Sequence, residues 1–168
     1  MPIDTLPDEV LLVIFDFFVD EDAKIKKEVE AWQSLVHVCR QWRSVVFGSP
    51  RRLSLRLVCG ANTPVRDTLD VWPPLPLVIA CSTFRTNSED NVIAVLERSD
   101  RVRQIDLRDN SFSPMENVMA AMQQPFPELT DLVIKTHFGT VTDLPDSFLG
   151  GSSPRLRCLK LYGVPFPG

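Results

Sequence analysis

An apolar pattern recurs in this chain at a constant interval, and it constrains the fold more than any other feature. The pattern has three apolar positions, separated first by two residues and then by one. Its clearest copies are Val102-x-x-Ile105-x-Leu107, Leu129-x-x-Leu132-x-Ile134 and Leu156-x-x-Leu159-x-Leu161, and they begin at positions 102, 129 and 156. A constant period of this length is typical of repeat proteins, whose units stack because a single unit cannot cover its own apolar face. We therefore expect one stacked array over residues 51–168.

Two strands are predicted ahead of these copies. Residues 51–58 alternate leucine with polar residues, which is the period of a half-covered strand. Counting one further interval back from Val102 reaches Leu75, so a second strand is expected over 76–81. This count places Val78 and Ala80 in the core positions of that strand.

Helix-length connections are expected between strands at 91–96, with Ser88 as its cap, and at 113–123 and 143–149. One copy also keeps an asparagine after its strand, at Asn110. This pattern resembles the leucine-rich repeat in degenerate form, and the resemblance implies a short solenoid of alternating strands and helices. Because the last unit lacks a polar cap, we expect a truncated product or a fragment of a longer protein.

Residues 1–50 follow a helical periodicity instead, and we expect them to form a separate helical domain. Thr5 and Pro7 suit the cap and first turn of a helix over 5–18. Apolar residues cover more than one face of this helix, because three lie off its main stripe: Leu12, Val13 and Phe17. A helix of this kind has to be covered on more than one side, which suggests that a partner covers part of it.

Two further segments complete the helical domain. The polar segment 20–30 favours a helix and is interpreted as a solvated extension. Residues 31–47 carry apolar positions that step by three or four, which predicts one continuous helix. Gly48-Ser49-Pro50 then supplies the usual stop residues.

The order of residues over 6–47 resembles the F-box. It contains Leu6-Pro7-Asp8-Glu9-Val10-Leu11 with Ile14-Phe15, and then Val38-Cys39-Arg40-Gln41-Trp42-Arg43. The stretch from Val19 to Ala31 is longer than in most F-boxes, as in the expanded fungal members of the family. The resemblance implies a three-helix F-box that docks on the adaptor of cullin-RING ubiquitin ligases of the SCF type. The residues implied to face the adaptor are Leu6, Pro7, Val10, Leu11, Ile14, Phe15, Val38, Cys39 and Trp42.

The expected fold class is thus α+β to α/β, with a three-helix F-box followed by a short leucine-rich repeat solenoid. The expected function is a substrate receptor that binds the ligase adaptor, and through it a cullin, while the repeats hold an unknown target protein. An alternative stays open, because apolar periodicity alone also fits ordinary core. In that alternative the chain is a non-catalytic interaction scaffold whose N-terminal helices merely cap the repeat array.

The strand positions that point away from the core form the predicted target-binding face. With the repeat register above, this face carries Gln104, Asp106, Arg108, Asp131, Val133, Lys135, Cys158, Lys160 and Tyr162. Their charges are mixed, so they indicate no preferred class of partner.

Other classes of function lack a signature. The formal net charge is −4, which argues against nucleic acid as a partner. The four cysteines are far apart in the sequence, so we expect no metal and no cofactor. The N-terminal residues lack a signal peptide, and the longest apolar run, from Val10 to Phe15, is too short to span a membrane. We expect a cytoplasmic or nuclear protein with no membrane partner.

No catalytic group is predicted either. His37 and Cys39 are two residues apart on one expected helix, so they face different directions. His137 beside Asp131 or Asp143 is interpreted as a surface histidine in a loop. The sequence contains no phosphate-binding glycine loop and no HExxH or GxSxG motif, so we expect a protein that is not an enzyme.

Overall fold

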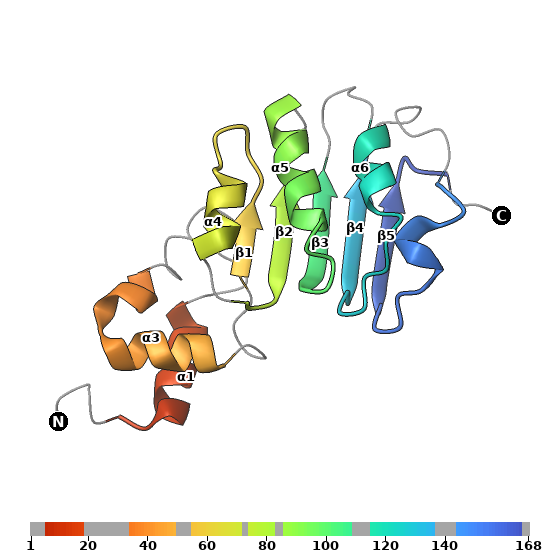
Figure 1. The fold of residues 1–168 in the computed structure, drawn as a ribbon. Coiled ribbons are helices and arrows are strands. Elements are labelled where there is room, and N and C mark those ends of the chain that lie inside the picture. Colours follow the sequence, from red (N-terminus) through yellow and green to blue (C-terminus); the bar gives the residue numbers. More distant parts are fainter. Residues whose placement is uncertain are drawn as a thin grey trace.

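The structure, a computed structural model, describes residues 6–18, 34–49, 55–71, 74–82, 86–108, 115–136 and 144–165 (Figure 1). Its elements follow in the order α1 Asp8–Phe18, α3 Arg40–Gly48, β1 Leu55–Val58, α4 Val65–Val71, β2 Leu77–Cys81, α5 Thr86–Leu96, β3 Val102–Arg108, α6 Glu116–Ala121, β4 Asp131–Lys135, the 3-10 helix η2 Phe148–Gly151, and β5 Cys158–Tyr162. Residues 34–38 form a further short helix. The predicted solvated extension over 20–30 lies outside the described residues.

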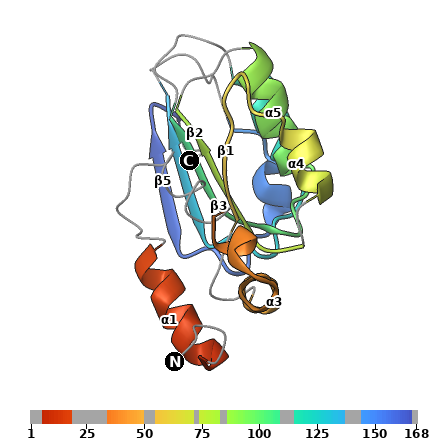
Figure 2. The ribbon, with the colours of Figure 1, turned by 90° about the vertical axis from the view of Figure 1, so that its left-hand side faces the viewer.

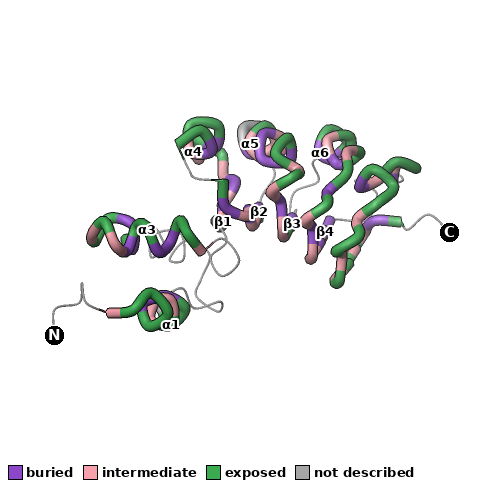
Figure 3. The backbone as a smooth tube through the Cα atoms, turned by 60° about the horizontal axis from the view of Figure 1, so that its bottom comes forward, coloured by how far each residue is buried: buried purple, intermediate pink, exposed green. Residues whose placement is uncertain are grey.

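The strands form one parallel sheet in the order β1-β2-β3-β4-β5, the same order as in the sequence. Parallel neighbours need a crossover connection, and α4, α5 and α6 supply three of them. These helices stand in a row on one face of the sheet (Figure 3). In the view turned by 90°, α4 and α5 lie together on one side of the strands (Figure 2). This arrangement of helices and parallel strands is compatible with the expected α+β to α/β class.

The repeat period coincides with the register of the last three strands. Ile105 lies opposite Leu132, and Leu132 lies opposite Leu159. The side chains of Ile105 and Leu132 are buried on the helix-covered face, as the apolar pattern predicts. The assignment of this array to leucine-rich repeats stays a prediction.

The same count is wrong for β2. Ile79, and not Val78, lies opposite Ile105, so the interval here is one residue shorter than between the later strands. A bulge causes the difference: Leu77 pairs with Val102 and Val78 with Gln104, so the register passes over the intervening Arg103. The core positions of β2 are consequently Leu77, Ile79 and Cys81.

Two of the expected helices also differ in extent. Helix α5 begins at Thr86, so Ser88 is a buried residue inside the helix and does not cap it. The expected helix over 143–149 is a turn followed by η2, since Leu149 and Gly150 have φ angles of 56° and 64°. A side chain at Gly150 would lie 2.6 Å from the backbone nitrogen of Pro125, so this close approach requires glycine.

Hydrogen bonds from side chains to backbone tie each strand unit to its neighbour. Asn91 Nδ2 donates to the Gly60 carbonyl at 2.8 Å, and Gln124 Nε2 donates to the Leu96 carbonyl at 2.6 Å. These bonds satisfy carbonyl groups between the stacked units, beside an apolar core that runs from α1 to Val164.

Candidate functional site

The first candidate site is built on α1 and α3, which pack against each other. The carbonyl of Pro7 accepts hydrogen bonds from the backbone N–H groups of Val10 and Leu11, at 3.0 and 3.1 Å, and so starts α1. Phe15 on α1 then lies against Trp42 on α3, with ring centroids 4.8 Å apart. Aromatic pairs at this separation add to the stability gained by burial. This contact determines which side of α1 packs against α3.

The expected continuous helix over 31–47 is wrong, because Cys39 interrupts it. Cys39 has an extended backbone, with φ −156° and ψ 173°, and its Sγ accepts a hydrogen bond from the backbone N–H of Trp42. It therefore caps α3. Arg43 Nε in turn donates to the Val36 carbonyl at 3.0 Å, which satisfies a carbonyl at the end of the preceding short helix.

The residues predicted to face the adaptor divide into three groups by their burial. Leu11, Phe15 and Trp42 are buried in the chain's own core. Leu6, Ile14 and Cys39 are half-buried. The exposed members are Pro7, Val10 and Val38.

An exposed apolar stripe remains on α1, formed by Val10, Val13 and Phe17, which are 43%, 49% and 84% exposed. Their spacing of three and four residues places them on one side of the helix. Val13 and Phe17 were not among the residues predicted to face the adaptor. The signal for them was nonetheless in the sequence, since both lie off the buried stripe of α1.

The second candidate site is the face of the sheet opposite α4, α5 and α6. The register brings together all nine residues predicted there, in three rows across β3, β4 and β5. These rows are Gln104–Asp131–Cys158, Asp106–Val133–Lys160 and Arg108–Lys135–Tyr162. The predicted face is therefore one continuous surface, which we call the open face.

Hydrogen bonds fix part of the open face. Arg108 donates two hydrogen bonds to the Asp106 carboxylate, each 2.8 Å long, and this partner raises the pKa of the guanidinium above its ordinary value. Gln104 Nε2 donates to Asp131 Oδ2 at 3.2 Å. Lys135, Lys160 and Tyr162 are exposed on β4 and β5, in the same two rows as Arg108 and Asp106. This part of the open face carries two ammonium groups and one aromatic ring.

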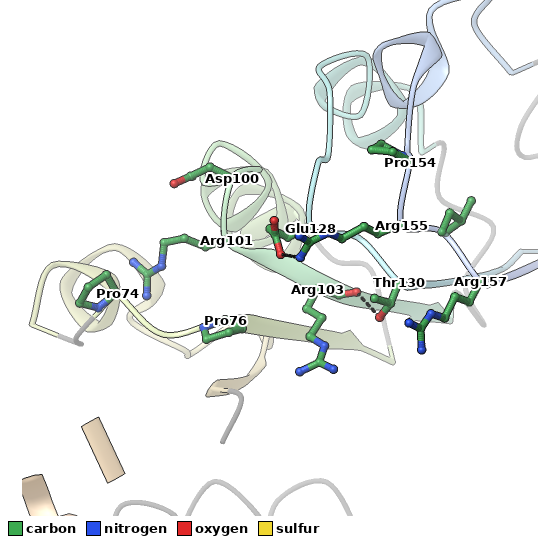
Figure 4. Close-up of a pocket in the computed structure, with 11 residues that line it drawn as sticks. Pro74, Pro76, Asp100, Arg101, Arg103, Glu128, Thr130, Pro154, Arg155 and Arg157 are labelled. Carbon is green, nitrogen blue, oxygen red and sulfur yellow. Dashed lines mark hydrogen bonds and ion pairs between the residues drawn. The ribbon is translucent and has the colours of Figure 1, made fainter. Parts of the chain in front are cut away.

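A third feature was missed by the sequence analysis. A hollow of about 880 Å³ lies at the amino ends of β2 to β5 and is shown in Figure 4. Its charged lining residues are Asp100, Arg101, Arg103, Glu128, Arg155 and Arg157. The available signal was the period itself, because positions 101, 128 and 155 are separated by the same interval as the apolar pattern, as are 103, 130 and 157.

The histidines considered as catalytic groups are placed differently by the structure. His37 is an exposed helical residue, whereas His137 and Asp143, like Asn110 of the repeat pattern, lie outside the described residues. Among the described residues no group of three or more His, Cys, Asp or Glu is placed to hold a metal ion. None of the helices described is long and apolar enough to cross a membrane.

Comparison with known proteins supports the F-box prediction for the N-terminal residues. A family model described as F-box-like matches residues 3–56. The chain therefore carries an F-box-like domain, which confirms the resemblance to the F-box. No curated protein and no solved structure shows a significant match. The leucine-rich repeat and the likeness to fungal members stay predictions.

Proposed function

We propose that this chain is a substrate-receptor subunit of a cullin-RING ubiquitin ligase of the SCF type. Its F-box-like domain docks on the ligase adaptor, and its sheet holds a target protein. The observation that carries the proposal is the exposed apolar stripe of Val10, Val13 and Phe17 within the F-box-like match. A partner that covers this stripe removes apolar surface from water, which favours binding.

The docking surface combines the stripe with the exposed and half-buried residues beside it. Leu6, Pro7 and Ile14 lie on the same part of the chain as the stripe, and Val38 is exposed at the end of the short helix before α3. Burying an apolar side chain the size of Phe17 contributes about 1.5–3 kcal/mol. Leu11, Phe15 and Trp42 serve docking indirectly, because their burial holds α1 against α3.

The target is held by the open face. In this account the chain performs no chemistry and raises the effective concentration of the target near the ubiquitin-charged enzyme. The exposed Lys135, Lys160 and Tyr162 are the proposed contacts, together with the acidic and amide side chains of Asp131 and Gln104. Side chains of this kind suit a polar protein surface, with the tyrosine as an anchor.

A second candidate function is a scaffold whose N-terminal helices cap the array without binding an adaptor. It is favoured by the burial of Leu11, Phe15 and Trp42 in one core with the rest of the chain. This function does not explain why the apolar side chain of Phe17 is exposed. The two functions differ in whether a partner covers the stripe.

Co-expression of the full chain with the ligase adaptor, followed by affinity capture and gel filtration, tests the proposal. Val13→Glu should abolish the complex, because it places an unpaired charge in an apolar contact. Val71→Glu is the matched control, since Val71 is an exposed apolar residue on α4. A complex that survives Val13→Glu, or a folded wild-type chain that forms no complex, supports the scaffold instead.

A further inference from the structure

Two rows of side chains run across the amino ends of β3, β4 and β5. The first row contains Arg103, Thr130 and Arg157. Backbone hydrogen bonds hold it in place, because Thr130 N–H donates to the Arg103 carbonyl and Arg157 N–H donates to the Thr130 carbonyl, both at 2.8 Å. The second row contains Arg101, Glu128 and Arg155. Equivalent positions of successive units thus gather four arginines at one edge of the sheet.

The bulge in β3 lies at Arg103, the first residue of this row. Arg103 is the extra residue of this bulge, and a bulge of this kind redirects the side chain of its extra residue. In Figure 4 the guanidinium groups of Arg103 and Arg157 extend to the same side of the strands, one on either side of Thr130. Neighbouring strands are about 4.8 Å apart, so the two arginines start roughly 10 Å apart and both reach a group lying between them.

Arg155 and Arg101 of the second row also contribute to the hollow. Arg155 forms an ion pair with Glu128. Arg101 donates from Nε and Nη2 to the Leu75 carbonyl, at 3.1 and 3.0 Å, and burial lowers the pKa of its guanidinium although Asp100 opposes this effect. Among the lining residues that the structure describes, four are arginines and two are carboxylates, which gives this part of the hollow a positive charge within a chain of net charge −4.

We propose that this hollow binds a short acidic peptide segment of a partner protein, with its carboxylates held between Arg103 and Arg157. Each basic residue in the described part of the lining is an arginine, and the planar guanidinium matches a carboxylate with two parallel hydrogen bonds. A volume of about 880 Å³ accommodates only a short segment.

A protein segment fits this surface better than nucleic acid. Nucleic-acid binding uses a basic face that extends along the partner, whereas the four arginines of this hollow cluster at one edge of the sheet in a chain of net charge −4. The proposal goes beyond the receptor function, since none of these four arginines belongs to the α1 stripe or to the open face. It is tested on the chain alone, so failure of adaptor docking would leave it unaffected.

The experiment is a fluorescence anisotropy titration of the full chain with a labelled peptide of alternating Glu and Gly residues. A peptide with Gln in place of Glu is the neutral control. We expect the Glu peptide to bind and the Gln peptide not to bind, with affinity that falls as salt screens the charges. Arg157→Gln and Arg103→Gln should each lower the affinity about tenfold, because each removes a charge-assisted hydrogen-bond donor.

Arg66→Gln provides the matched control. Arg66 lies on α4, outside the hollow, and its side chain is 70% exposed in an ion pair with Glu97. The Arg66→Gln variant loses the same charge as Arg157→Gln, so it should bind the Glu peptide with the affinity of the wild type. Thermal unfolding of Arg157→Gln, whose side chain is exposed, checks that the fold is kept.

Three results would overturn the proposal. The first is binding of the Gln peptide as tight as that of the Glu peptide. The second is an Arg157→Gln variant that binds the Glu peptide like the wild type. The third is an RNA oligonucleotide of equal charge that binds more tightly than the peptide and depends on Arg157, which would make nucleic acid the ligand.

Discussion

The ring of Phe15 lies against the indole of Trp42, with centroids 4.8 Å apart and planes inclined by 60°. This contact joins α1 to α3 from inside the F-box-like domain. It also divides α1 into two sides. The side that carries Phe15 holds the domain together, whereas Val10, Val13 and Phe17 are exposed, and we propose that a partner covers them.

Loss of this aromatic contact should destabilise the chain. Phe15→Ala removes a fully buried ring and leaves a cavity against Trp42, so the free energy of unfolding should fall by about 3–5 kcal/mol. Urea unfolding followed by tryptophan fluorescence measures the change. Phe17→Ala serves as the control, because its ring is exposed and its removal leaves no cavity. Equal stability of Phe15→Ala and the wild type would contradict the packing of α1 on α3.

Cys39 should be replaceable by a better capping residue. Its Sγ accepts from the Trp42 N–H at 3.5 Å, and a serine hydroxyl is a stronger acceptor in the same position. We expect Cys39→Ser to keep or raise the midpoint of thermal unfolding. Cys39→Ala removes the acceptor and should cost about 1 kcal/mol. If alanine were as stable as serine at this position, Cys39 would not cap α3.

Substitutions at Gly163 and Gly151 should distinguish the cost of backbone strain from the cost of a steric collision. Both have positive φ angles, 73° and 68°, but a side chain at Gly163 would collide with the Thr136 carbonyl, whereas nothing lies within 4 Å of one at Gly151. Alanine at either position costs about 1–2 kcal/mol for its left-handed backbone. The urea midpoint should therefore fall further for Gly163→Ala. A larger loss from Gly151→Ala would contradict the turn after β5.

The four thiols should divide by accessibility. Cys59 and Cys81 are buried in the described chain, and burial raises the pKa of the Cys59 thiol, with Cys81 adding to the effect. Because the thiolate is the reactive form, iodoacetamide at pH 8 should leave both unmodified until the chain unfolds. Cys39 and Cys158, which are half-buried, should react first. Mass spectrometry of the peptides measures the order, and early labelling of Cys59 would contradict its burial.

The sequence predicts those features that depend on periodic burial. Ile105, Leu132 and Leu159 repeat at a fixed spacing because parallel strands stack in register, so β3, β4 and β5 and the open face follow from the period. The F-box-like domain is predicted from the order of its residues, which the family match supports.

Features that depend on one local backbone geometry are not predicted. The bulge at Arg103 shifts β2 by one residue, and no change of polarity in the sequence marks it. Cys39 is apolar enough to continue a helical stripe, yet it caps a new helix. The hollow escaped prediction because its arginines come from separate units and gather only when the strands are stacked.

Isothermal titration of the ligase adaptor with the wild-type chain, Phe17→Ser and Val71→Ser tests the central claim most directly. The two apolar side chains are almost equally exposed, at 84% and 83%, but only Phe17 belongs to the α1 stripe. We expect the wild type and Val71→Ser to bind with the same Kd, and Phe17→Ser to bind about tenfold more weakly or worse, as loss of an aromatic anchor does. A folded wild-type chain that does not bind the adaptor, or equal Kd values for all three chains, would contradict docking through α1.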